Sequence, residues 1–326
     1  MSFDADLIVD RRRMRRKLTF WRVVTVFIAI VAVVGAGLAF SNRGAITGGP
    51  GGGIARVNID GLIRSNRPRS EALTRLAESN AKAVIVHINS PGGTVAGSEE
   101  LYDSLIKVKA KKPMVVVVDG LAASGGYIAA MASDRILAQQ SAIVGSIGVI
   151  FQYPNVTELL KTIGVQVETI KSSPLKAAPS GYEPTTPEAR AAVESIVRDS
   201  FDWFKGLVRD RRHLDDASLQ RVSDGRVFTG RQAVELKLID GLGDEQAAID
   251  WLAKEKNIDP KTPIRDYPLA PRFSDLPFLH VAALGLLDAV GLNGLAERFR
   301  EFGAVQAVER LNLDGLLALW HPPSSN

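Results

Sequence analysis

The chain of 326 residues contains no cysteine and only four histidines. The absence of cysteine excludes a disulfide framework, a thiol nucleophile and any thiolate metal site. No two histidines stand at the i, i+4 spacing that would place two metal ligands on one face of a helix. We therefore expect neither a metal site nor a cofactor in this protein.

The chain also lacks net charge once its first 22 residues are set aside. Residues 1–22 carry seven basic and three acidic side chains, which accounts for the whole formal charge of +4. The other 33 basic and 33 acidic residues balance, so the sequence predicts no basic face and no nucleic-acid partner. An apolar content of 46% is ample for a packed core of one large domain or two small ones.

One long uncharged run stands near the N-terminus. Residues 23–40 are 18 residues without a charge, and as a helix they would be about 27 Å long, close to the thickness of a bilayer core. The basic cluster before this run predicts that residues 1–22 lie in the cytoplasm and that the rest lies outside. A cleaved signal peptide ending near Ala39 is the alternative, but its apolar region is usually shorter. We therefore expect a retained transmembrane anchor.

The residues after the anchor divide into a linker, a folded domain and an extension. Residues 41–53 are glycine-rich and are typical of a flexible linker. From residue 54, strand-like runs alternate with helix-like runs, which predicts an α/β domain over residues 54–263. The expected strands cover residues 54–59, 83–88, 113–118, 135–138, 148–151 and 165–170. The expected helices cover residues 69–79, 97–109, 125–133, 155–163, 187–211 and 230–237. Residues 264–326 form an apolar C-terminal extension, with helices expected at 279–290 and 305–320.

A serine stands where one buried strand gives way to a helix. The run from Val115 to Ala130 predicts a strand, a turn of very small residues, and a helix that begins at Ser124. Backbone N–H groups are unpaired at a helix start, and the helix dipole is positive there, so an oxyanion would be stabilised. The N–H of Gly125 would point toward that charge. The alternative is that Ser124 only caps its helix.

A second glycine turn follows the strand before it. In the run from Asn89 to Thr94, the free N–H groups of Gly92 and Gly93 could complete an oxyanion hole, although an ordinary loop has the same composition. A nucleophilic serine also needs a base. His87 lies within an apolar strand and is interpreted as a core residue, which disfavours a Ser-His-Asp arrangement.

Lysine can serve as the base when burial lowers its pKa. No carboxylate stands between Glu168 and Glu183, and within that window Lys176 is surrounded by proline, alanine and leucine. Such a lysine has no partner nearby in the sequence to hold its charge. Lys171 stands in the same window, so the residues alone leave both lysines as candidates.

Four motifs, in this order, resemble those of the SppA signal peptide peptidase family. They are Asn89–Gly93, Asp119–Tyr127, Val144–Val149 and Ser223–Ala233, and the resemblance extends over roughly residues 54–252. It implies a Clp/crotonase-like α/β fold of repeated ββα units and a Ser-Lys mechanism. By position, the resemblance makes Ser124 the nucleophile, Lys176 the general base and Ser146 the hydroxyl that orients the lysine. It assigns the oxyanion N–H groups to Gly93 and Gly125, with Gly92 close by.

The same resemblance implies a membrane-anchored endopeptidase that degrades remnant signal peptides. It places the protein in a bacterial inner membrane with a single span, a cytoplasmic N-terminus and a periplasmic catalytic domain. Because the chain has one copy of the catalytic unit, the resemblance also implies a ring-shaped homo-oligomer whose site is shared between subunits. The alternatives are a Ser-Lys protease that acts on other membrane proteins, a crotonase-like acyl-CoA enzyme, and a non-catalytic membrane scaffold.

Overall fold

The structure is a computed structural model that describes residues 17, 20–22, 24–26, 52–269 and 317–319. The chain divides into two compact units, Met1–Ala45 and Ile46–Asn326. In the first unit the described residues are helical. A search of the described residues finds no helix that is both long and apolar enough to cross a membrane. Most of the predicted anchor, residues 23–40, lies outside the described residues, as does most of the linker.

The second unit is built on a mixed sheet of nine strands, counted over the described residues. The strands are β1 (Ile54–Ile63), β2 (Ala83–Thr94), β3 (Met114–Ala123), β4 (Arg135–Ala138), β5 (Ile143–Gly145), β6 (Val227–Thr229), β7 (Gly241–Leu242), β8 (Ile264–Asp266) and β9 (Leu317–Leu319). The main order is β6-β5-β3-β2-β1-β8, and β4 pairs with both β3 and β7. Only the β5–β6 and β2–β9 pairs are antiparallel.

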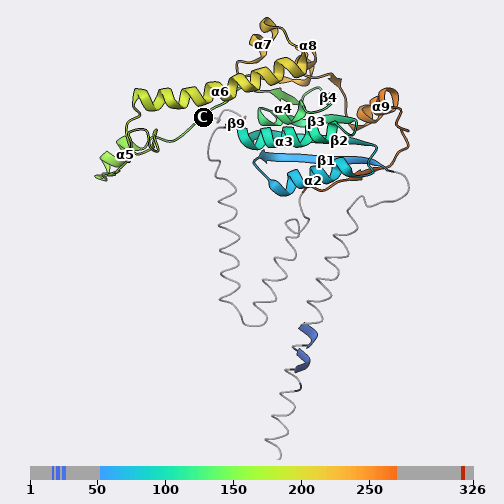
Figure 1. Ribbon diagram of the computed structural model, residues 1–326, viewed down its shortest axis with the longest axis horizontal. Helices are drawn as coiled ribbons and strands as arrows, with labels where there is room; N and C mark the ends of the chain where they lie inside the picture. Colours follow the sequence, from blue (N-terminus) through green and yellow to red (C-terminus); the bar gives the residue numbers. More distant parts are fainter. Residues whose placement is uncertain (1–16, 18–19, 23, 27–51, 270–316, 320–326) are drawn as a thin grey trace, which may run out of the picture. The chain divides into compact units, whose positions relative to one another are not determined.

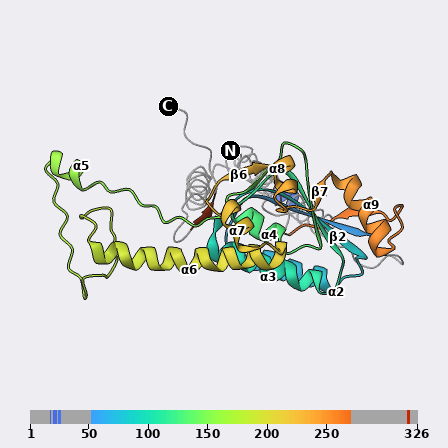
Figure 2. The same ribbon diagram turned by 90° about the horizontal axis from the view of Figure 1, so that it is seen from above.

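Helices connect the parallel strands, which need crossover connections. They are α2 (Arg67–Glu78), α3 (Val95–Lys109), α4 (Gly125–Ala130), α5 (Thr157–Thr162), α6 (Pro187–Arg212), α7 (Asp216–Val222), α8 (Gly230–Glu235) and α9 (Glu245–Lys256). Figures 1 and 2 show α2 and α3 running alongside the central strands. The side chain of Thr94, the last residue of β2, caps α3 by accepting a hydrogen bond from the N–H of Gly97, so strand and helix join without a loop.

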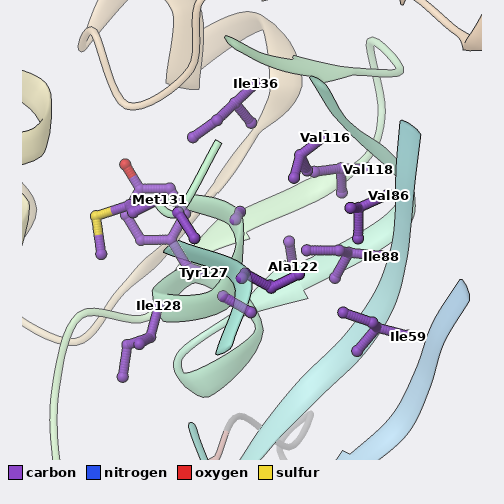
Figure 3. Packing of buried hydrophobic residues seen from close by; sticks show 14 of the residues in the cluster. Ile59, Val86, Ile88, Val116, Val118, Ala122, Tyr127, Ile128, Met131 and Ile136 are labelled. Atoms are coloured by element: carbon purple, nitrogen blue, oxygen red, sulfur yellow. The ribbon is translucent and has the colours of Figure 1, made fainter. Parts of the chain in front are cut away.

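Each face of the sheet buries its own cluster of side chains, because successive residues of a strand point to opposite faces. In β3, Val116 and Val118 belong to the larger cluster, and Val115 and Val117 belong to the smaller one, which α9 covers. Figure 3 shows part of the larger cluster, to which Tyr127 and Ile128 of α4 and the valines and isoleucines of β2 and β3 all belong. The core therefore holds α4, the helix that follows Ser124, firmly against the strands.

Several predicted elements differ from the structure. Residues 165–170 form no strand, and in residues 148–151 Ile150 makes only an isolated bridge. The helix predicted at 125–133 ends at Ala130. Within the helix predicted at 305–320, Leu317–Leu319 is instead a strand, because its backbone pairs with β2. The helix predicted at 279–290 lies outside the described residues.

The sheet also continues past the domain boundary that we predicted after residue 263. Strand β8, Ile264–Asp266, lies parallel to β1 at the edge of the sheet. Tyr267 continues this packing, since its N–H donates to the carbonyl of Arg56 and its hydroxyl donates to the carbonyl of Ala72. The first residues assigned to the C-terminal extension are therefore part of the folded core.

Candidate active site

Ser124 links β3 to α4 in a backbone conformation that L-amino acids rarely adopt, with φ of 54° and ψ of −116°. Its N–H donates to the carbonyl of Gly145 at 2.7 Å, and its carbonyl accepts from the N–H groups of Tyr127 at 2.9 Å and Ile128 at 3.0 Å. These bonds hold the sharp turn and begin the helix. Strain of this kind is concentrated at functional sites.

The Ser124 hydroxyl does not cap α4. The residue is only 1% exposed, and its Oγ has no hydrogen-bond partner among the residues that the structure describes. A buried polar atom without a partner costs about 1–3 kcal/mol, so native proteins keep few of them. The interpretation of Ser124 as a helix cap is therefore wrong. A nucleophile needs a hydroxyl that is not engaged in a structural hydrogen bond, and the Ser124 hydroxyl meets this need on a strained turn.

The two glycine turns lie against each other. A Cβ on Gly126 would stand 2.6 Å from the carbonyl oxygen of Ser90, so only glycine lets the start of α4 approach the turn after β2 this closely. The hydroxyl of Ser90 fixes that turn, because it donates to the carbonyl of Gly61 at 2.6 Å and accepts from the N–H of Gly92 at 3.1 Å. The structure thus places the predicted oxyanion donors, Gly93 and Gly125, on adjoining segments.

Ser146 also lies next to Ser124 in the fold. It is buried, has a φ of 52°, and directly follows Gly145, whose carbonyl accepts the hydrogen bond from Ser124. The N–H of Ser146 donates to the carbonyl of Arg226 at 2.8 Å. That carbonyl belongs to the Ser223–Ala233 motif, which explains why a segment some eighty residues away in the sequence accompanies the site.

The two candidate lysines differ in their partners. Lys171 is paired with Glu183, and this hydrogen-bonded pair lowers the pKa of the Glu183 carboxyl. Lys176 is exposed, and no ion pair holds its amine among the described residues. In the part of the chain that the structure describes, no hydrogen bond joins Lys176 to Ser124 or Ser146. A single chain therefore assembles the serines and glycines but leaves the lysine apart from them.

Lys176 belongs to a segment that we call the arm, residues 152–186, which includes α5 and leads into α6. No residue of α5 is buried. Figures 1 and 2 both show α5 and the start of α6 away from the sheet. The arm exposes several apolar side chains: Leu159, Ile163, Val165, Val167, Ile170, Leu175 and Tyr182.

A cavity of about 610 Å³ opens beside Ser146. Its lining combines apolar residues with charged ones: Ile147, Val149, Ile150, Phe201 of α6 and Leu317 of β9, together with Glu194, Arg198 and Asp224. A cavity next to Ser146 that is lined by both apolar and charged residues has room for a side chain of a bound peptide. The sequence did not reveal this cavity, because its walls come from segments that are distant in the chain.

A second feature that the sequence did not reveal is a charged cluster around His87. The Nδ1 atom of His87 lies 3.0 Å from Asp119, and its Nε2 atom lies 3.0 Å from Glu245. Arg56 donates two hydrogen bonds to Glu245, at 2.6 and 2.7 Å. His87 therefore ties β2 to β3 and α9 and is not a simple core residue. In the described ranges, no group of three or more histidine or acidic side chains is placed to hold a metal ion.

Comparison with known proteins agrees with the four motifs. Residues 106–259 match the family model described as Peptidase family S49. A Synechocystis protein named as a candidate protease is 37% identical over 209 residues, which cover 64% of this chain and 76% of that protein. An Enterococcus faecium protein named as a candidate signal peptide peptidase SppA is 35% identical, over 59% of this chain and 56% of its own. Protease 4 of Haemophilus influenzae is 28% identical, over 66% of this chain and 36% of its own.

Among solved structures, a ClpP1 variant of Listeria monocytogenes aligns with 58% of this chain and 91% of its own, at 16% identity and a TM-score of 0.40. That score is too low to establish a common fold, so the assignment depends on the sequence relatives. The match to the Synechocystis protein covers about three quarters of that protein's length. The chain therefore belongs to Peptidase family S49, the SppA-type protease family that its motifs predicted.

Proposed function

We propose that this protein is a membrane-anchored serine endopeptidase that degrades remnant signal peptides with a Ser-Lys pair. The observation that carries the proposal is the hydroxyl of Ser124, which is buried, has no partner among the described residues, and stands on a strained turn. Two glycine turns adjoin it and carry the proposed donors Gly93 and Gly125, whereas the N–H of Gly92 already donates to the hydroxyl of Ser90. Membership of a peptidase family supports the proposal, and so does the relative named as a candidate signal peptide peptidase SppA.

In the proposed mechanism the uncharged amine of Lys176 takes the proton of the Ser124 hydroxyl. The Ser124 oxygen attacks a peptide carbonyl, and the N–H groups of Gly93 and Gly125 stabilise the resulting oxyanion, with Gly92 close by. The amine of Lys176 then gives its proton to the leaving nitrogen, which departs as the new N-terminus of the second fragment. Water, activated by the same amine, releases the acyl group and restores the hydroxyl. Ser146 orients the amine by a hydrogen bond.

The proposed base has to come from a second copy of the chain. A lysine works as a general base only after it is removed from water, because desolvation disfavours the ammonium form. Lys176 is exposed in a single chain, and the arm that carries it presents apolar side chains to solvent. Contact between the arm and a neighbouring copy would bury both. A closed ring of copies, each giving its lysine to the next, meets this need.

The proposed location rests on the sequence before the folded domain. An uncharged run at residues 23–40 after a basic cluster predicts a single span of a bacterial inner membrane, with the catalytic domain on the periplasmic side. Signal peptide remnants lie in that membrane, so the anchor would hold the site close to them. We also propose that the sheet is a Clp/crotonase-like arrangement, since parallel strands joined by helices form its centre.

The test is hydrolysis of an apolar fluorogenic peptide by the full chain in detergent. We expect Ser124→Ala and Lys176→Ala each to lose at least about 1,000-fold in kcat/KM, since each removes a member of the catalytic pair. Lys171→Ala is the matched control, because Lys171 is paired with Glu183, and it should keep most of the activity.

A mixture of Ser124→Ala and Lys176→Ala chains then tests the shared site. After dissociation and reassembly, some sites would combine an intact serine with an intact lysine from another chain, and we expect activity to return. Full activity in Lys176→Ala would refute the base. Unchanged activity in Ser124→Ala would refute the peptidase mechanism and favour a scaffold.

A further inference from the structure

The hydroxyl of Ser90 is buried beside the proposed oxyanion donors, and the proposed mechanism gives it no part. Ser90 is fully buried near the end of β2. Its Oγ donates to the carbonyl of Gly61 in β1 at 2.6 Å and accepts from the N–H of Gly92 at 3.1 Å. A hydroxyl has one proton to donate, and that of Ser90 is committed to Gly61. Any effect of this buried residue on a substrate therefore has to pass through the backbone that it holds.

Ser90 stands where the central strands lose their regular register. Between regular pairs of β1 and β2, one residue of β1, Gly61, faces two residues of β2, Ser90 and Pro91. The pairing of β2 with β3 shifts at the same place, between Ile88 and Ser90. Shifts of this kind interrupt the ladder of backbone hydrogen bonds. The two hydrogen bonds of the Ser90 side chain connect the strands where the ladder does not.

The peptide unit that most needs a fixed orientation is the one that carries the N–H of Gly93. This unit links two consecutive glycines, and Gly92 has a φ of 100°. Glycine has more accessible backbone conformations than any other residue, so the N–H of Gly93 can turn unless Gly92 is restrained. An oxyanion hole stabilises charge only when its donors are oriented before the charge develops. The hydrogen bond from the N–H of Gly92 to Ser90 supplies that restraint.

Ser90 also packs on the start of α4, which carries the other proposed donor. A Cβ on Gly126 would stand 2.6 Å from the carbonyl oxygen of Ser90 and 3.3 Å from its Cβ. Ser90 is opposite Ala122, two residues before Ser124. The contact with α4 is thus made by the backbone and the Cβ of Ser90, which alanine keeps, whereas the hydroxyl holds only the turn before Gly93.

We propose that Ser90 is a positioning residue that aims the N–H of Gly93 at the oxyanion through its hydrogen bond with the N–H of Gly92. The inference depends on the proposed function, because it requires an oxyanion to form beside Ser124. The same hydrogen bond withholds the N–H of Gly92 from the oxyanion, which leaves Gly93 as the donor from this turn. The Ser90 hydroxyl therefore acts on the transition state and leaves substrate binding unchanged.

The first experiment compares steady-state hydrolysis of an apolar peptide by the full-length wild type and by Ser90→Ala. We expect kcat to fall about 10- to 100-fold with KM within about twofold, because the change weakens an interaction made only in the transition state. Ser104→Ala is the matched control, since Ser104 is buried in α3 and its hydroxyl donates to the carbonyl of Glu100, outside the proposed site. Its kcat should stay within about twofold of the wild type. Ser90→Cys replaces the hydroxyl with a poor hydrogen-bonding group of similar shape, and it should show the same loss if Ser90→Ala does not fold.

The second experiment uses a peptide aldehyde as a probe of the oxyanion position. In the proposed site the Ser124 oxygen adds to the aldehyde carbon, the hydroxyl proton passes to the amine of Lys176, and the aldehyde oxygen becomes the oxyanion. The matching peptide alcohol has no carbonyl and forms no such adduct. From inhibition constants, we expect Ser90→Ala to bind the aldehyde at least about tenfold more weakly than the wild type does, and the alcohol within about twofold.

The outcomes separate this inference from the proposed function. If Ser124→Ala abolishes hydrolysis while Ser90→Ala keeps the kcat and the aldehyde affinity of the wild type, the proposed function stands and the positioning role is refuted. An equal loss of kcat in Ser104→Ala, or a change confined to KM in Ser90→Ala, also refutes that role. If the wild type neither hydrolyses the peptide nor binds the aldehyde more tightly than the alcohol, the proposed function is wrong and the inference falls with it.

Discussion

At the scale of single residues, the strain at Ser124 is directly measurable. A residue other than glycine at φ 54°, ψ −116° costs of order 1–3 kcal/mol, and glycine adopts this conformation without that cost. We therefore expect Ser124→Gly to raise the free energy of unfolding by about 0.5–1 kcal/mol, after the extra entropy of glycine in the unfolded chain is subtracted. The same change removes the proposed nucleophile and should abolish peptide hydrolysis. Urea unfolding and peptide hydrolysis measure the two effects.

The matched control for this prediction is Lys237→Gly. Lys237 has a φ of 59°, is exposed, and is not part of the proposed site. Its replacement should raise stability slightly and leave activity unchanged. A loss of stability in Ser124→Gly would show that the turn is not strained.

The sequence predicted the neighbourhood of the candidate residues that belong to continuous motifs, whereas their catalytic roles stay predictions. Ser124, Ser146 and the two glycine turns each follow a buried strand, and parallel strands bring their ends to one edge of a sheet. The environment of Lys176 could not be predicted, because its neighbours Leu175 and Ala177 are exposed as well and no core position fixes their place. The pairing of Lys171 with Glu183 was equally hidden, since the eleven residues between them form no helix or strand that would fix their spacing.

At the scale of secondary structure elements, replacement by alanine should have opposite effects on stability at two glycines. A Cβ on Gly93 would stand 1.7 Å from the carbonyl oxygen of Ile63, so Gly93→Ala would force β2 away from β1. We expect it to destabilise the domain by at least about 3 kcal/mol. In α6, a Cβ on Gly206 would meet nothing within 4 Å, and Gly206→Ala should stabilise by about 0.5–1 kcal/mol.

Thermal or urea unfolding of both variants tests this contrast. Equal stability of Gly93→Ala and the wild type would contradict the close approach of β1 and β2. The result also bears on catalysis. A loss of activity in Gly93→Ala would not identify Gly93 as an oxyanion donor, because the substitution also moves the backbone that carries its N–H group.

The cluster that joins β1, β2 and α9 predicts a dependence of stability on pH. The hydrogen bonds from Arg56 lower the pKa of the Glu245 carboxyl, burial opposes this shift, and His87 adds to the lowering. A carboxyl whose pKa is lower in the folded state stabilises above its unfolded pKa, near 4.5, and loses that contribution as the pH falls through the folded value. Acidification below about pH 4.5 should therefore weaken the link between these elements.

Glu245→Gln tests this dependence by urea unfolding at pH 7 and pH 3. We expect a loss of about 1–2 kcal/mol at pH 7 that shrinks toward zero at pH 3. Glu255→Gln, at an exposed position of the same helix, should change little at either pH. A loss at pH 3 as large as that at pH 7 would contradict an ionised carboxylate as the source of the stabilisation.

Elements were predictable where the pattern of apolar residues was long. The central strands β1, β2 and β3 and the long helices α3 and α6 lie where periodicity placed them, because their core faces repeat over ten residues or more. The short strands β5, β6 and β7 have two or three residues each and follow from tertiary pairing. Residues 165–170 have the composition of a strand, yet within the described residues they have no edge to pair with.

At the scale of the whole molecule, the exposed arm predicts an assembly. Ile170 is fully exposed in a single chain, which is unusual for isoleucine in a stable monomer. We expect Ile170→Asp to dissociate the oligomer and to abolish peptide hydrolysis, while the thermal midpoint of the domain stays within about 2 °C. Sedimentation velocity in detergent measures the assembly. Leu242→Asp is the control at an exposed leucine outside the arm, and an Ile170→Asp chain that stays assembled and active would contradict the role of the arm.

The placement of β8 has a consequence for synthesis of the protein. Strand β1 emerges from the ribosome early, but its outer edge pairs with β8, and Arg56 and Asp266 are 210 residues apart. During translation of the intervening residues this edge has open backbone groups that can pair with another nascent chain. The outer edge of β1 therefore stays without its partner strand until residues 264–266 have been synthesised.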